Sequence, residues 1–152
     1  MPHKKLIKNY TTEVATHQTV AEIQQLLAEN GATGIAFEYD GQGRLVSIFF
    51  RVPYQGTTLS FRLPAKPDEV YQALFANLNQ EWKYKDQRME KATRIAWRVC
   101  KLWLEAQLTH VNLGQAKIQE VFLPYLVLDD NKTLYERMEK SQFLLPASSS
   151  SG

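Results

Sequence analysis

The chain has 152 residues, of which 44% are hydrophobic and 22% are charged, and its formal net charge at pH 7 is +2. These values are typical of one soluble globular domain with a sizeable core. No apolar run approaches the roughly 20 residues of a membrane-spanning helix, and residues 1–20 lack the apolar core of a secretory signal, so we expect a cytoplasmic protein without membrane association. A single cysteine, Cys100, excludes an internal disulfide and is expected to be buried and inert.

A helix is expected near the N-terminus, after a basic segment at residues 1–10 that could supply a short strand. Thr19 and Glu22 have the spacing of a capping box, which predicts that the helix begins at Thr19 and ends before Gly31. The apolar residues of this helix are Val20, Ile23, Leu26 and Leu27.

Three antiparallel strands are expected next, over residues 33–40, 44–52 and 57–63. Apolar and polar residues alternate with a period of two in these segments, and turn-forming residues separate them. One face of the sheet is apolar and should pack against the helices. Its residues are Ile35, Phe37, Tyr39, Val46, Ile48, Phe50, Val52, Leu59, Phe61 and Leu63.

The other face of the predicted sheet carries an aromatic residue, Phe49, together with Arg51 and Arg62. An aromatic ring beside arginines on a sheet could stack a base, and these three residues form a secondary candidate surface. The alternative is that Phe49 lies beneath the N-terminal strand, the C-terminal segment or a partner chain.

Helices dominate the second half of the chain. Pro67 begins a short helix that extends to about Leu78, and a long helix is predicted over residues 82–113. The buried face of the long helix is predicted from residues that recur at steps of three and four: Met89, Ala92, Ile95, Ala96, Val99, Cys100, Trp103 and Ala106. Further helical segments are expected over 115–123 and around 134–138, with a turn at 129–131 between them.

These elements predict an α+β fold. An antiparallel three- to four-stranded meander packs on a long helix, and a helical part follows at the C-terminus. Residues 1–147 are expected to form a single domain, and residues 148–152 a disordered polar tail.

Positive charge is concentrated on the long helix, where residues 83–101 hold seven Lys and Arg against two Asp and Glu. Cations on one rigid face add to a local field that attracts phosphates, and Trp97 beside them could stack a base. The candidate nucleic-acid-binding residues are therefore Lys83, Lys85, Arg88, Lys91, Arg94, Trp97, Arg98 and Lys101. The alternative is a solvated helix face whose cations pair with Asp86, Glu90 and Glu105, with Trp97 packed under a loop or a second subunit.

No catalytic or metal-binding pattern stands out in the sequence. His3, His17 and His110 fall in separate segments and form no zinc-binding spacing. The acidic turn at 129–131 lacks the glycine and the glutamate of a calcium loop, and neither a phosphate-binding glycine loop nor a Gly-x-Ser-x-Gly elbow is found. We therefore expect a protein that is not an enzyme and that uses no metal and no cofactor.

Several sequence blocks resemble small proteins that are encoded in bacterial phages and prophages. These blocks include residues 8–12 (KNYTT), 30–34 (NGATG), 61–64 (FRLP), 83–88 (KYKDQR) and 120–125 (EVFLPY). The resemblance implies a bacterial host cell as the setting, but the group has no established activity, so no site residue can be transferred.

Two functional hypotheses follow. The first is an accessory protein of phage or prophage type that binds nucleic acid through the basic helix face. The second is a protein-protein interaction module or an inhibitor of a host or phage enzyme. Such a protein could act against host defence, and it could act as a homo-oligomer. A binder of small nucleotides would use the same residue types as the first hypothesis.

Overall fold

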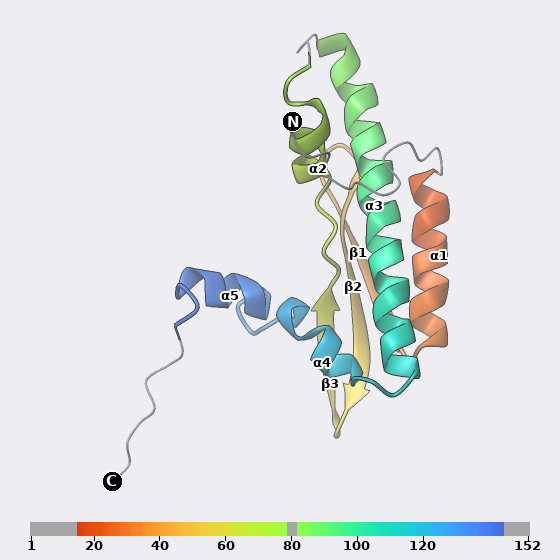
Figure 1. The fold of residues 1–152 in the computed structure, drawn as a ribbon, viewed down its shortest axis with the longest axis vertical. Coiled ribbons are helices and arrows are strands. Elements are labelled where there is room, and N and C mark those ends of the chain that lie inside the picture. Colours follow the sequence, from red (N-terminus) through yellow and green to blue (C-terminus); the bar gives the residue numbers. More distant parts are fainter. Residues whose placement is uncertain (1–14, 79–81, 145–152) are drawn as a thin grey trace, which may run out of the picture.

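The computed structural model describes residues 15–78 and 82–144 (Figure 1). The expected strand within residues 1–10 and the polar tail at 148–152 lie outside these ranges. The elements are α1 (Thr16–Glu29), β1 (Gly34–Tyr39), β2 (Leu45–Tyr54), β3 (Thr57–Arg62), α2 (Pro67–Phe75), α3 (Trp82–Asn112), α4 (Ile118–Val121), the 3-10 helix η1 (Leu123–Tyr125) and α5 (Leu134–Lys140). This arrangement confirms the predicted α+β class.

The three strands form an antiparallel meander in the order β1-β2-β3. Phe50 on β2 lies opposite Ile35 on β1 and Phe61 on β3. Their side chains point to the face that α1 and α3 cover in Figure 1, and the buried cluster there also holds Trp97 and Phe122. One helical layer therefore covers one face of the sheet, as alternating apolar residues predict.

The β1–β2 pairing contains an irregularity at the end of β1, where two residues predicted for the apolar face, Tyr39 and Val46, are exposed. Glu38 pairs with Ser47 and Tyr39 pairs with Leu45, so Val46 is an extra residue on β2. An extra residue shifts the alternation of side chains at that point. Leu45 is consequently buried and Val46 is 38% exposed, so the prediction that Val46 belongs to the apolar face was wrong.

Helix α1 begins one turn earlier than the sequence predicts. Its N-cap is Ala15, and Thr19 lies inside the helix with no exposed surface. The hydroxyl of Thr19 accepts a hydrogen bond from Nη1 of Arg98 on α3 at 3.3 Å instead of capping the helix. The capping-box prediction was therefore wrong because a tertiary partner uses that hydroxyl.

Helix α3 runs for 31 residues and confirms the predicted long helix. Ala92, Ile95, Ala96 and Cys100 are buried as predicted, whereas Val99 is 39% exposed. Trp97, Leu104 and Leu108 are buried in place of Val99 and Ala106. Helices α1 and α2 both pack on α3, so its buried surface is wider than one stripe.

The C-terminal part leaves the body along the outer edge of β3. The predicted helix over 115–123 is confined to the short α4, and the chain continues through η1, which contains Pro124. Val127 N–H donates to the Ser60 carbonyl at 2.8 Å, and Leu126 forms a bridge with Phe61. Helix α5 then extends away from the sheet in Figure 1, and it has no buried residue. Among the described helices, none combines the length and the apolar character needed to cross a bilayer.

Candidate functional site

Contacts with α1 separate two of the seven predicted cations of α3 from the others. Arg98 Nη1 donates to Glu22 Oε2 at 2.5 Å, and Lys101 Nζ lies 3.1 Å from the same oxygen. These two side chains are only 22% and 17% exposed. Their hydrogen bonds hold the pKa of Glu22 below its ordinary value. Arg98 and Lys101 therefore join two helices and are poorly placed to reach phosphates.

The other Lys and Arg residues of α3 differ from one another in their contacts and their exposure. Arg94 pairs with Glu90 one turn away at 3.2 Å, and its side chain is 19% exposed. Arg88 lies over the ring of Tyr84, with its guanidinium carbon 5.5 Å from the ring centre. Lys85 is exposed and Lys91 is partly exposed, while the side chain of Lys83 is outside the described part. The seven cations thus do not form one open surface.

Trp97 lies in the main core and has no exposed surface. It belongs to the same buried cluster as Ile23 on α1 and Phe50 on β2. Its indole Nε1 has no hydrogen-bond partner among the described residues. The prediction that Trp97 stacks a base was wrong because the sheet and α1 enclose the side of α3 that carries it.

The secondary surface predicted from the sequence does assemble. Phe49 on β2 pairs directly with Arg62 on β3, and the Arg62 guanidinium carbon lies 5.1 Å from the centre of the Phe49 ring. Arg62 Nη1 donates to Glu136 Oε1 at 2.9 Å, and Arg62 Nη2 donates to the Asn131 carbonyl at 3.0 Å. The C-terminal segment therefore fixes the arginine over the ring, although it leaves Phe49 partly exposed.

Arg51 completes this surface on the β1 side. It pairs with Gly34, and a Cβ atom added to Gly34 would lie 2.8 Å from Nη2 of Arg51. The bare glycine therefore gives the guanidinium room to lie across β1, and a Cβ at this position would require the arginine side chain to shift. Arg51 is exposed and forms no ion pair with the described residues.

These residues surround a hollow of ≈ 420 Å³ on the sheet face opposite the helices. Its size is that of a small ligand pocket. The lining residues are Ala36, Glu38, Phe49, Arg51, Ser60 and Asn131. Gly34, Asn131 and Glu136 also belong to this surface but were not predicted from the sequence. The strand glycine was a usable signal, whereas the return of residues 131–136 to Arg62 depends on tertiary structure.

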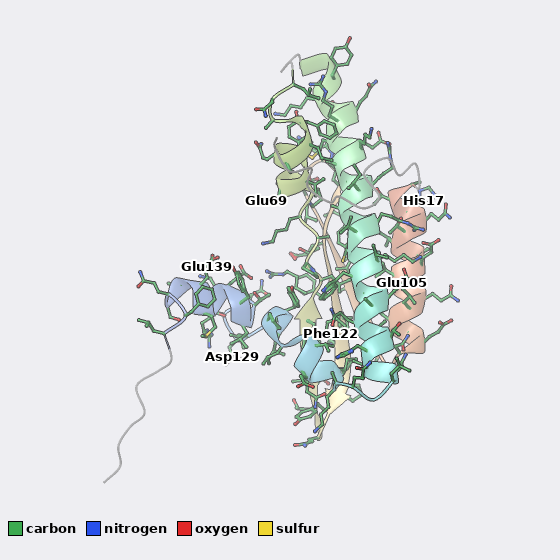
Figure 2. The ribbon with its side chains drawn as sticks, in the orientation of Figure 1. His17, Glu69, Glu105, Phe122, Asp129 and Glu139 are labelled. Carbon is green, nitrogen blue, oxygen red and sulfur yellow. The ribbon has the colours of Figure 1, made fainter. Side chains whose placement is uncertain are left out.

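A wider groove of ≈ 840 Å³ lies between the β3–α2 connection and α5. Glu69 on α2 and Glu139 on α5 stand on its two sides, as Figure 2 shows. Asp68 and Glu136 add two further carboxylates, and Tyr135 contributes an exposed ring. These four carboxylates outnumber the two cations of the lining, Arg62 and Lys66, so its net negative charge suits a cationic group better than a phosphate.

The described residues give little support for a reactive cysteine or for a metal site. Cys100 is buried, and burial raises the pKa of its thiol to about 12, so it is not a reactive thiolate. Within the described ranges, no three His, Cys, Asp or Glu side chains gather in a way that could hold a metal ion.

The sequence was compared with protein-family models and with curated proteins, and the structure was compared with solved structures. None of these comparisons found a match.

Proposed function

We propose that the protein binds single-stranded nucleic acid on the open face of its sheet. The proposal rests on one observation: Phe49 lies in the middle of that face, with Arg62 against its ring and Arg51 beside it. Sheet-surface readers of single strands combine aromatic rings that stack bases with cations that contact the backbone. We place the protein in a bacterial host cell, in agreement with its resemblance to phage and prophage proteins.

The sheet face is a better candidate than the helix because its aromatic residue, Phe49, is partly exposed, whereas Trp97 on α3 is buried. Arg98 and Lys101 are engaged by Glu22, and Trp97 cannot reach a ligand. On the sheet, the Phe49 ring and Arg51 line one hollow, while Arg62 lies against the ring and is held there by Glu136. Glu38 at the hollow and Glu136 beside Arg62 offset part of the positive charge, so we expect modest affinity that depends mainly on stacking.

Salt dependence distinguishes the two surfaces. Contacts from two arginines to a single strand give a slope of log K against log salt of about −1.4, whereas seven cations would give about −5. We would titrate a fluorescein-labelled deoxythymidine oligonucleotide of about 12 nucleotides with the full chain, between about 50 and 200 mM salt. Fluorescence polarisation reports the binding.

Phe49→Ala should weaken this binding by about 5- to 150-fold, because stacking contributes about 1–3 kcal/mol per base. Tyr54→Ala is the matched control, since Tyr54 is a partly exposed aromatic residue at the end of the same strand. Lys85→Ala tests the exposed part of α3 and should leave the affinity unchanged. Equal binding by Phe49→Ala and the wild type, or a slope near −5 that Lys85→Ala reduces, would refute the sheet site.

The groove between α2 and α5 supports a second candidate function, which is an interaction with a host or phage protein. Glu136 is engaged by Arg62, but Asp68, Glu69 and Glu139, together with the exposed ring of Tyr135, suit a basic segment of a partner. A peptide of alternating lysine and leucine is a suitable probe, and Glu69→Lys together with Glu139→Lys should abolish its binding. Unchanged peptide binding by this double variant would exclude the groove.

A further inference from the structure

We infer that two copies of the chain pair through the outer edge of β1, antiparallel and centred on Ala36, so that the partner's Glu38 meets Arg51. The two sheets then join into one sheet of six strands. This interface shares Arg51 with the proposed nucleic-acid surface but does not involve Phe49, and it is tested without nucleic acid.

The two edges of the sheet differ. The outer edge of β3 is occupied by the chain itself, because Val127 N–H donates to Ser60 and Leu126 bridges Phe61. β1 has β2 as its one strand partner within the described part. Its sequence, GIAFEY, has no proline and no lysine, which are the residues that commonly prevent edge strands from pairing.

Hydrogen bonds on β2 show which peptide groups of β1 face outward. Leu63 N–H donates to the Ile48 carbonyl at 2.9 Å, whereas the Arg51 carbonyl accepts from Thr33 N–H at 2.9 Å. Successive residues of a strand direct their peptide groups to opposite sides. Arg51 therefore bonds toward β1, and its pairing with Gly34 means that Gly34 and Ala36 bond toward β2.

The N–H and C=O groups of Ile35 and Phe37 consequently point to the open edge of β1. A two-fold axis at Ala36 places Ile35 opposite the partner's Phe37, so outward-facing peptide groups meet each other. The side chains of Ile35 and Phe37 lie on the apolar side of the sheet and pack against its core. The same register therefore continues the apolar face from one copy to the next.

Charge complementarity favours this register. The Arg51 guanidinium lies across Gly34, and Glu38 is four residues further along β1, about 13 Å away at the rise of a strand. Glu38 and Arg51 form no ion pair within the described chain. In the pair, Gly34 lies opposite the partner's Glu38, about 4.8 Å away and on the same face. Each Arg51 would then receive a carboxylate that the described part of its own chain does not supply.

The test is the oligomeric state of the full chain, measured by sedimentation over a range of concentrations without nucleic acid. We expect a dimer, and Glu38→Arg should raise its dissociation constant at least about ten-fold because two like-charge contacts replace two ion pairs. Arg51→Glu should act in the same way. The double variant with Glu38→Arg and Arg51→Glu should restore the dimer, because it reverses both charges.

Glu139→Arg is the control, since it makes the same charge change on α5, far from β1 along the chain, and should leave the dimer intact. A wild-type chain that remains monomeric would overturn the inference, as would a dimer that Glu38→Arg does not weaken. If deletion of residues 1–14 converts a monomeric chain into a dimer, the chain's own N-terminal segment occupies the edge, and the inference is also wrong. Phe49→Ala should leave the dimer intact, so failure of the nucleic-acid proposal is recognised separately.

Discussion

Glu22 joins α1 to α3 through a single carboxylate. Arg98 and Lys101 both donate to its Oε2, and together they hold the pKa of Glu22 below its ordinary value of 4.5. A carboxyl group with a lower pKa in the folded state stabilises the fold above its unfolded-state pKa. That contribution is lost as the pH falls from about 4.5 through the lowered value.

Glu22→Gln should therefore lower the melting temperature at pH 7, because the neutral amide interacts less strongly with the two cations. The difference from the wild type should shrink as the pH falls below 4.5, since the wild-type carboxyl group is then protonated as well. Thermal unfolding at pH 7 and pH 3 checks this. Glu29→Gln on the same helix is the control, because this carboxylate accepts from the neutral Gln25 and its change should leave the melting temperature at pH 7 close to that of the wild type.

The same residue shows why the candidate site on α3 was only partly predictable. The spacing of Arg94, Arg98 and Lys101 correctly indicates that they share one side of a helix. The spacing contains no information on the acid that faces them. That acid is Glu22 on α1, which precedes Arg98 by 76 residues. Phe49, Arg51 and Arg62 were easier to group, because the alternation of a strand assigns side chains to faces without knowledge of distant partners.

At the scale of elements, α5 is held by its N-cap and by the ion pair of Glu136 with Arg62, and not by buried side chains of its own. The Thr133 hydroxyl accepts from Glu136 N–H at 3.2 Å, and Glu136 Oε1 accepts from Thr133 N–H at 3.0 Å. Thr133 is buried, but α5 itself contributes no buried side chain. This helix should therefore open independently of the sheet.

Thr133→Ala should destabilise α5 by about 1 kcal/mol, the usual contribution of an N-cap hydroxyl. Hydrogen exchange of the amides of residues 134–140 should become correspondingly faster, while the amides of β2 remain as protected as in the wild type. Thr109→Ala is a suitable control, because Thr109 bonds to a carbonyl within α3 and caps no helix. Loss of β2 protection in Thr133→Ala would show that α5 and the sheet unfold together.

The elements themselves were largely predictable, and the errors occur where tertiary contacts decide. Period-two and helical patterns located the three strands, α2 and α3 within a few residues. The start of α1 was misplaced because Arg98 takes the Thr19 hydroxyl, and Val46 was misplaced because of the irregularity opposite Tyr39. The short form of α4 reflects Pro124, which lies within η1 and limits the helix before it.

At the scale of the whole molecule, the buried side chains form two clusters that share α3. The main cluster joins the sheet, α1 and the C-terminal half of α3, and it includes Phe50 and Trp97. The second cluster joins α2 to the N-terminal half of α3 through Tyr71, Phe75 and Ala92. Separate clusters of this kind favour separate cooperative units.

Phe75→Ala should accordingly loosen one part of the molecule. Removing a buried phenylalanine costs up to about 3–5 kcal/mol, and we expect that loss in the exchange protection of α2 and of the first turns of α3. Phe50→Ala, in the main cluster, should lower protection throughout the chain. Native-state hydrogen exchange at increasing denaturant compares the two variants. A uniform loss of protection in Phe75→Ala would mean that α3 couples the two clusters into one unit, because a continuous helix of 31 residues then transmits the opening of one end to the other.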